Sequence, residues 1–175
     1  MAEATLGGGR GVTAFTRFQT ARLIAVLLPL ALLGGALGSQ YIGGLAPCEM
    51  CYWQRWPHGA AILLAGLAFT VPAAAELPRI LTLLAAFAIA VSGAIGVYHA
   101  GVELGIFEGF TACTTTAKAA STEELLKELM KVPLVRCDQV PWSFLGISMA
   151  GWNGILSLGG AAAIAGLTLT GRRRA

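Results

Sequence analysis

The stretch "ILTLLAAFAIAVSGAIGVYHAG", residues 80–101, contains no charged residue and is long enough to cross a lipid bilayer as a helix. Three other stretches of the 175-residue chain share this property, namely Leu23–Ile42, Trp56–Ala75 and Gln139–Gly171. Only 12% of the residues are charged and 56% are hydrophobic, whereas roughly 25% are charged in a soluble domain. Because lipid offers backbone groups no hydrogen-bond partner, each stretch is expected to be a helix. The sequence therefore predicts an all-α membrane protein built as a four-transmembrane-helix bundle.

We predict one integral membrane domain over residues 1–175. Its approximate spans are 21–42, 57–75, 80–100 and 148–170, its external loops are 43–56 and 101–147, and its tails are 1–20 and 171–175. Small residues recur four apart within the spans, for example at Gly34 and Gly38 and at Ser92 and Gly96. This spacing lets membrane helices approach closely, which fits a tightly packed bundle.

The first apolar stretch has a second interpretation, a cleaved signal peptide. Basic residues precede it, and the small-residue segment "GGALGS", residues 34–39, ends it. Uncharged residues nevertheless continue through Tyr41 and Ile42, which makes the stretch longer than the apolar core of a usual signal peptide. We therefore favour a retained transmembrane helix.

Lysine and arginine set the expected orientation, because cytoplasmic loops carry an excess of them. Seven arginines fall on the side of the chain termini: Arg10, Arg17, Arg22, Arg79, Arg172, Arg173 and Arg174. The other side has Arg55 in a short loop and four basic residues spread over the long loop. We therefore predict cytoplasmic termini and external loops on the opposite side. The net charge of +3 then reflects topology, and we expect no nucleic-acid partner.

All four cysteines, Cys48, Cys51, Cys113 and Cys137, fall in the external loops. In a bacterial cell that side of the membrane is oxidising, and the count suggests one disulfide pair in each loop. Zinc is a rival interpretation, because two Cys-x-x-Cys pairs are typical of a zinc site. Here 23 residues separate the second pair, which weakens that interpretation, and no Cys-x-x-Cys-His motif for attached haem is present. We therefore expect no metal.

The segment "PCEMCYWQRWP", residues 47–57, favours a redox role for its cysteines. Pro47 restricts the residue before it to extended geometry, so a helix is expected to start directly after it. A cysteine at a helix N-terminus has a lowered pKa and is a better nucleophile and leaving group. Cys51 and Arg55 would share one helix face, where the guanidinium would favour a Cys51 thiolate and could hold a carbonyl oxygen of an electron acceptor. Arg55 could instead anchor lipid headgroups, because Trp53 and Trp56 beside it are typical of an interfacial belt.

The long external loop contains "STEELLKELMK", residues 121–131, which predicts a short amphipathic helix. Ser121 and Glu124 form a capping box, and the leucines line one face. The helix would lie on the membrane surface or pack on the protein's own loops, and the sequence does not decide between the two.

With these features the sequence resembles the bacterial disulfide bond formation protein B (DsbB) family. "CEMCYWQRWP" is similar to the family's Cys-x-x-Cys-x-x-x-Arg segment, and "CDQVPWSFLGISMAGW", residues 137–152, is similar to the stretch that enters its last helix. The match covers nearly the whole chain after about residue 15. The resemblance implies a dithiol:quinone oxidoreductase of the bacterial inner membrane with periplasmic cysteine loops. It would reoxidise a periplasmic DsbA-like dithiol oxidase and pass the electrons to ubiquinone or menaquinone, which sustains protein disulfide formation.

The resemblance also implies residue roles. All four cysteines would be catalytic, paired as disulfides Cys48–Cys51 and Cys113–Cys137. Cys113 would take the mixed disulfide with the partner, and Cys137 would pass the electrons to the first pair. Cys51 would lie beside the quinone, and Arg55 would orient and polarise it.

Two histidines are interpreted differently. His99, in "YHAGVE", residues 98–103, corresponds to a family histidine near the quinone and is expected to contribute to cofactor binding. A lone histidine at a helix end is also typical of an interface residue. His58, just past Pro57, is interpreted as structural.

Two other functions stay open. A vitamin K epoxide reductase-like enzyme also couples thiols to a quinone, but its loop cysteines precede its Cys-x-x-Cys motif, whereas Cys48 and Cys51 come first here. A non-enzymatic membrane scaffold would use both cysteine pairs as structural disulfides. Such bonds would resist mild dithiols and reduce no quinone.

Overall fold

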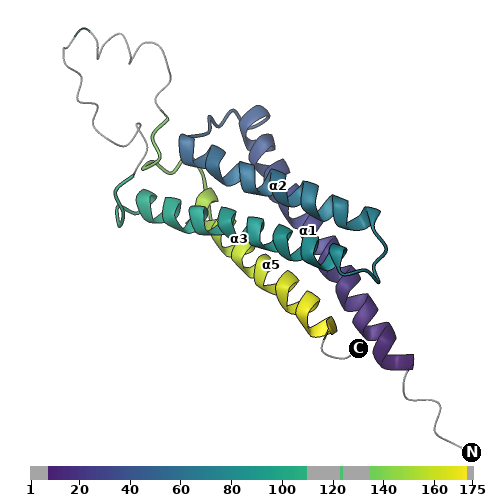
Figure 1. The fold of residues 1–175 in the computed structure, drawn as a ribbon. Coiled ribbons are helices and arrows are strands. Elements are labelled where there is room, and N and C mark those ends of the chain that lie inside the picture. The colour runs from purple at the N-terminus through teal and green to yellow at the C-terminus, as the bar shows by residue number, and fades with distance from the viewer. Residues whose placement is uncertain (1–7, 110–122, 124–134, 173–175) are drawn as a thin grey trace, which may run out of the picture.

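The computed structural model describes residues 8–109, 123 and 135–172 of the chain (Figure 1). Cys113 and, apart from Glu123, the amphipathic helix expected over residues 121–131 lie outside the described residues. The expectations that concern them stay predictions.

The described residues form a helical bundle, as the uncharged stretches predict. Its elements in chain order are α1 (Gly8–Tyr41), α2 (Glu49–Thr70), α3 (Leu77–Glu103), β1 (Ser143–Phe144), β2 (Ile147–Ser148) and α5 (Met149–Arg172). Helix α3 has Pro78 in its first turn, where the missing N–H of proline costs no hydrogen bond. The all-α fold class is confirmed, with one small hairpin added.

Within the described part of the chain, three helices are long and apolar enough to cross a membrane. The qualifying segments are Thr16–Tyr41, Leu77–Glu103 and Met149–Thr170. Helix α2 is not among them, because Gln54, Arg55 and His58 place polar groups in its first turns. The expectation of four spans is therefore confirmed for three helices, and passage of α2 through the membrane stays a prediction.

The β1–β2 hairpin directly before α5 was not predicted. Leu145 and Gly146 form its turn with φ angles of 52° and 78°, and such positive angles are what a tight two-residue hairpin turn requires. The Trp152 indole N–H donates to the Phe144 carbonyl at 3.0 Å. The hairpin is thus fastened to the first turn of α5.

The four helices pack in a ring in which α3 contacts α2 and α5, and α1 closes the ring against the same two helices. The start of α1 and the end of α5 lie at one end of the bundle, and the starts of α2 and α5 lie at the other (Figure 1). The core consists mostly of alanines, with Ile89 and Ile164 as its large members. Large side chains such as Leu27 and Leu63, 60% and 70% exposed, point outward. This arrangement suits a bundle surrounded by lipid, since lipid tails are as apolar as leucine.

Two arginines fasten the end of the bundle that carries the start of α1. The buried Arg22 guanidinium donates to the Ala68 carbonyl at 2.6 Å and lies 4.1 Å from the centroid of the Phe69 ring. Arg79 donates to the Thr168 carbonyl at 3.5 Å. Both carbonyls belong to the final turns of helices, where positive charge is favourable. Arg22 and Arg79 thus lie at the same end, which agrees with their grouping on one side from the sequence.

Helices α3 and α5 approach closely at small residues. A Cβ atom on Gly96 would lie 2.9 Å from the Ala150 carbonyl oxygen and 2.9 Å from the Gly154 nitrogen, too close for any side chain. Around Gly34 and Gly38 of α1, by contrast, no atom lies within 4 Å of such a position. The expected close approach is therefore found at Gly96 and is absent at the two α1 glycines.

Gly96→Ala should lower the free energy of unfolding by about 1–3 kcal/mol, because overpacking forces the α3 and α5 backbones apart. Thermal unfolding in detergent measures the loss. Gly66→Ala on α2 is the matched control, because nothing lies within 4 Å of the added methyl group. Equal stability of the two variants would show that the α3–α5 contact is not tight.

Candidate active site

The N-terminus of α2 positions the thiol pair. Cys48 is the N-cap residue, and its sulfur accepts a hydrogen bond from the Cys51 N–H at 3.4 Å. The unpaired N–H groups of a first helical turn place partial positive charge beside both sulfurs. The expectation that a helix starts directly after Pro47 is confirmed, since α2 begins at Glu49.

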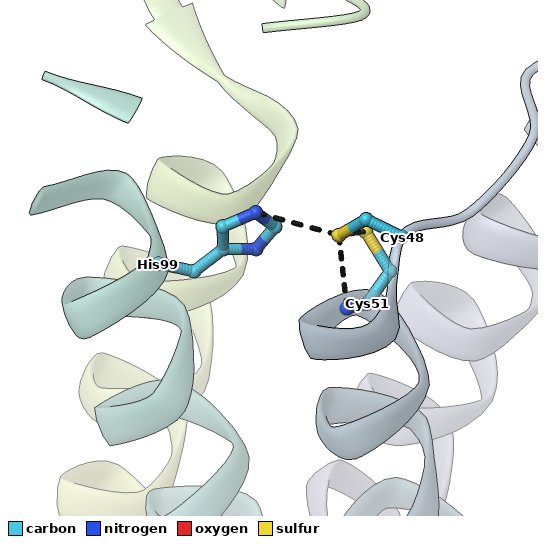
Figure 2. A group of neighbouring side chains, drawn as sticks. All are labelled: Cys48, Cys51 and His99. Carbon is cyan, nitrogen blue, oxygen red and sulfur yellow. Dashed lines mark hydrogen bonds between the residues drawn. The ribbon is translucent and has the colours of Figure 1, made fainter. Parts of the chain in front are cut away.

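The two sulfurs differ in proton affinity. The Cys48 thiol donates to the Cys51 sulfur across 3.0 Å (Figure 2). This hydrogen bond, assisted by the nearby charge of Arg55, lowers the pKa of Cys51 to about 7 although burial opposes it. The same contact raises the pKa of Cys48. Negative charge in the reduced pair therefore collects on Cys51.

The Cys48–Cys51 disulfide stays a prediction. Both residues are free thiols in the structure. A disulfide needs the sulfurs about 2.05 Å apart. A separation of 3.0 Å is a short movement from that bond.

His99 reaches the thiol pair from the end of α3 (Figure 2). Its Nε2 lies 3.6 Å from the Cys48 sulfur and 3.9 Å from a carboxylate oxygen of Glu103. Its Nδ1 lies 2.9 Å from the Gln54 side-chain nitrogen. That nitrogen also faces the Met50 carbonyl, which only accepts, so it donates to His99 and leaves the imidazole hydrogen on Nε2. His99 therefore directs an N–H toward the cysteines.

Cys137 joins the same cluster from the loop before α5. Its side chain is fully buried and packs with Cys48, Met50 and Val102. The Cys137 thiol therefore lies against the Cys48 thiol, and the Cys137 backbone lies beside His99. Of the four predicted cysteines, three thus lie together, and the fourth, Cys113, is outside the described residues.

Arg55 lies one turn below Cys51 and is held by α1. It donates to the Gln40 side-chain oxygen at 2.5 Å and to the Ala36 carbonyl at 3.2 Å, and it lies 5.2 Å from the Tyr52 ring centroid. Its Nε atom is buried and has no hydrogen-bond partner among the described residues. The guanidinium is therefore fixed in place, and its Nε–H is unused among the described residues.

A cavity of about 600 Å³ opens beside these groups. Its polar lining comes from Cys48, Cys51, Gln54, Arg55, His58, His99, Glu103 and Asn153, among others. Its apolar walls include Ala31, Leu32 and Ala36 of α1, and Trp142 and Trp152 near the start of α5. This volume lies within the range of small-molecule sites, which are mostly apolar with a few convergent polar groups.

The cavity fits an aromatic ligand with oxygen atoms on its ring, such as a quinone. Two lining residues, Arg55 and His58, each have a buried ring or guanidinium nitrogen without a partner among the described residues. Such atoms lose free energy unless a ligand pairs with them. The apolar walls suit the ring and an isoprenoid tail.

The cluster also has the ligand types of a thiophilic metal. The ligand atoms of Cys48, Cys51 and His99 all lie within 4.8 Å of one another. Cysteine sulfur and histidine nitrogen are the ligands that zinc prefers. The sequence could not place His99 beside the pair. Metal binding here would require both thiols to be reduced, because a Cys48–Cys51 disulfide would remove two of the ligands.

Several polar residues of the site were not predicted from the sequence. Gln54, Ser92 and Asn153 are hydrogen-bonded to one another along the cavity wall, and Glu103 lies beside His99. The available signal was their polarity inside stretches that are otherwise apolar. His58, interpreted as structural, belongs to the same group.

Comparisons with known proteins identify the family of the chain. The family model described as "Disulfide bond formation protein DsbB" matches residues 18–167. "Disulfide bond formation protein B" of Shewanella sp. (strain MR-4) is 34% identical over 149 residues, 81% of this chain and 83% of the relative. The protein of the same name in Xanthomonas oryzae pv. oryzae (strain MAFF 311018) is 27% identical over 146 residues, 81% and 85% of the two chains. "Uncharacterized protein RP370" of Rickettsia prowazekii (strain Madrid E) is 23% identical over 145 residues, 81% and 83%. No solved structure matches the chain.

Alkylation of Cys51 in the reduced protein should slow as the pH falls through about 7, because the reactive thiolate is protonated below its pKa. In Cys48→Ala the largest cause of the shift is absent, so the pKa of Cys51 should rise toward its ordinary value. Ultraviolet thiolate absorbance, taken as the difference from Cys51→Ala, measures both. An unchanged titration in Cys48→Ala would show that the sulfur–sulfur hydrogen bond has no influence.

Proposed function

The chain belongs to the disulfide bond formation protein DsbB family, and on that premise we propose that it is a membrane dithiol:quinone oxidoreductase. It reoxidises a periplasmic DsbA-like dithiol oxidase and passes the electrons to ubiquinone or menaquinone. The observation that carries the proposal is the convergence of Cys48, Cys51 and Arg55 on one cavity, with Cys137 packed against Cys48 behind them. A structural disulfide needs no cavity and no charge beside it.

The neighbours of each sulfur support an order of thiol exchange. A partner thiolate attacks Cys113 of the Cys113–Cys137 disulfide and releases Cys137 as a thiolate. Cys137 contacts Cys48, so its attack on the second disulfide forms a Cys137–Cys48 bond and releases Cys51. A thiol of lower pKa is the better leaving group, and the pKa of Cys51 is about 7. Each exchange breaks one disulfide, forms another and moves one electron pair.

Arg55 and His99 have different proposed roles, one toward the quinone and the other toward the thiols. A quinone bound in the cavity would supply the two-electron acceptor. Arg55 lines the cavity with a fixed positive charge and has N–H donors that the described residues do not use, which supports its role in holding a ring oxygen. Both nitrogens of His99 are directed at protein groups, Gln54 on one side and Cys48 on the other. We assign His99 to the thiols, where its N–H would stabilise a Cys48 thiolate, although it also lines the cavity.

The proposed location is the bacterial inner membrane, with both termini cytoplasmic and the cysteine loops periplasmic. Arg22 contacts the end of α2 and Arg79 contacts the end of α5, whereas the thiols lie at the start of α2. Figure 1 shows the start of α2 at the opposite end of the bundle from the ends of α2 and α5. The excess of arginine at the first end supports a cytoplasmic assignment for it. The thiols then face the compartment where disulfides form.

The purified protein in detergent should reduce a short-chain ubiquinone when a reduced thioredoxin-fold dithiol oxidase is supplied. Cys48→Ser and Cys113→Ser should each abolish the loss of quinone absorbance, because each breaks one pair of the relay. Activity that survives either change would reject the two-pair relay. A folded protein that reduces neither ubiquinone nor menaquinone would instead support the scaffold with structural disulfides.

Arg55→Ala should raise the KM for the quinone roughly tenfold, the equivalent of about 1.4 kcal/mol for one charge-assisted contact. The disulfides of this variant should still form, which thiol alkylation and mass analysis can check. Arg17→Ala removes an exposed charge from α1 away from the cavity and serves as the control. An unchanged KM in Arg55→Ala would remove Arg55 from the quinone site.

A further inference from the structure

A chain of buried polar side chains links α2, α3 and α5 on one side of the cavity. Asn153 is at its centre, and its Nδ2 donates to the Gln54 side-chain oxygen at 2.8 Å and to the Ser92 carbonyl at 3.2 Å. Its Oδ1 lies 2.9 Å from Ser157 Oγ and 2.9 Å from His58 Nε2. Polar groups inside a membrane bundle are costly, so they are expected to be fully paired or functional.

These contacts determine which nitrogen of His58 carries the hydrogen. A backbone carbonyl only accepts, so the Asn153 atom facing the Ser92 carbonyl is the NH₂ group and the atom facing His58 is the oxygen. The Ser92 hydroxyl lies 2.9 Å from His58 Nε2 and donates its hydrogen to the Gln54 carbonyl at 2.8 Å. Two acceptors therefore face Nε2, which must carry the hydrogen. In the neutral ring Nδ1 then has a free lone pair.

His58 Nδ1 is the one ring nitrogen that this network does not use. It is buried and lacks a hydrogen-bond partner among the described residues, and the whole side chain is 3% exposed. His58 lines the same cavity as Cys51 and Arg55, and the three residues follow at i, i+4 and i+7 on one face of α2. His58 is one helical turn deeper in the bundle than Arg55. An unpaired lone pair in this position costs free energy, and a donor group of a ligand bound in the cavity would remove that cost.

We propose that His58 is a binding residue for the reduced form of the quinone, with Nδ1 accepting a hydrogen bond from a hydroquinone hydroxyl. The inference rests on the proposed function, because it needs a quinone in this cavity. The two oxygens of a quinone lie on opposite edges of its ring, so one site requires two polar contacts. Arg55 donates and suits a carbonyl or hydroxyl oxygen. The Nδ1 lone pair suits only a hydroxyl and repels a carbonyl oxygen.

This selectivity would favour the direction of electron flow. A site that binds the hydroquinone more tightly than the quinone makes reduction of the bound acceptor more favourable by the same factor. The proposed thiol chemistry of Cys48 and Cys51 is left unchanged. His58 acts on the acceptor and not on the sulfurs.

A matched pair of variants separates this role from a structural one. Glutamine places an amide NH₂ near the position of Nε2, so His58→Gln keeps the donor to Asn153 and removes the Nδ1 acceptor. Ser157→Ala is the control, because it removes one hydrogen-bond partner of Asn153 and leaves both ring nitrogens of His58 in place. Both are made in full-length protein carrying Cys51→Ser, which prevents electron exchange during binding. Thermal unfolding confirms that each variant is folded.

The readout is the ratio of dissociation constants for the oxidised and reduced forms of a short-chain ubiquinone. His58→Gln should weaken hydroquinone binding roughly fivefold relative to quinone binding, the size of one neutral hydrogen bond. Ser157→Ala should leave the ratio unchanged. An unchanged ratio in His58→Gln would overturn the role of His58 while leaving the quinone site intact. If neither form binds the parent protein, the proposed function fails as well.

Nitrogen-15 NMR of labelled histidines gives a second test without catalysis. The chain has two histidines, so the signals lost in His58→Gln identify His58. The ligand-free protein should show hydrogen on Nε2 and a bare Nδ1. Hydroquinone should shift the Nδ1 signal, and quinone should not. A hydrogen on Nδ1 in the ligand-free protein would overturn the proposal.

Discussion

The hydrogen bond between Gln54 and Asn153 is the interaction on which the polar interior of this bundle depends. It joins α2 to α5 at 2.8 Å, and two backbone carbonyls, those of Met50 and Ser92, fix the orientation of the two amides. Gln54 then presents its NH₂ group to His99, and Asn153 presents its oxygen to His58. The two joined amides therefore decide the hydrogen positions of two histidines. His99 directs an N–H at the thiols, and His58 keeps a ring nitrogen without a partner among the described residues.

That contact exists because α3 and α5 approach closely at glycine. A methyl group on Gly96 would lie 3.0 Å from the Asn153 side-chain nitrogen as well as against the α5 backbone. Any larger residue would push Asn153 away from Ser92 and Gln54. In water a bundle could gain stability from larger apolar side chains between helices, but lipid gives no such gain. Small residues and interhelical hydrogen bonds hold this bundle together, and the same two features build the wall of its cavity.

The sequence predicts the helices well because their cause is local. Lack of charge over Ile80–Gly101 is enough to require a helix in lipid, and Pro47 is enough to start α2. The cavity and its polar wall were not predictable in this way, because they depend on which helix faces meet. Gly34 and Gly96 each have a second small residue four positions away in the sequence. Only Gly96, however, lies where two helices are in close contact. The meeting of Cys137 with Cys48 was expected only from the family resemblance, since 88 residues separate them along the chain.

The asymmetry between Cys48 and Cys51 follows from the same packing. As the N-cap, Cys48 lies at the edge of the bundle where the loop bearing Cys137 and the end of α3 bearing His99 can reach it. Cys51 lies one turn into α2, on the face that Arg55 and the cavity share. In the proposed relay, a thiol that enters from the loop meets Cys48, and the charge that the exchange releases collects on Cys51 beside the cavity. If Cys51 were the cap and Cys48 lay beside Arg55, the charge would collect on the loop side instead. The proposed direction of transfer therefore depends on which of the two sulfurs caps the helix.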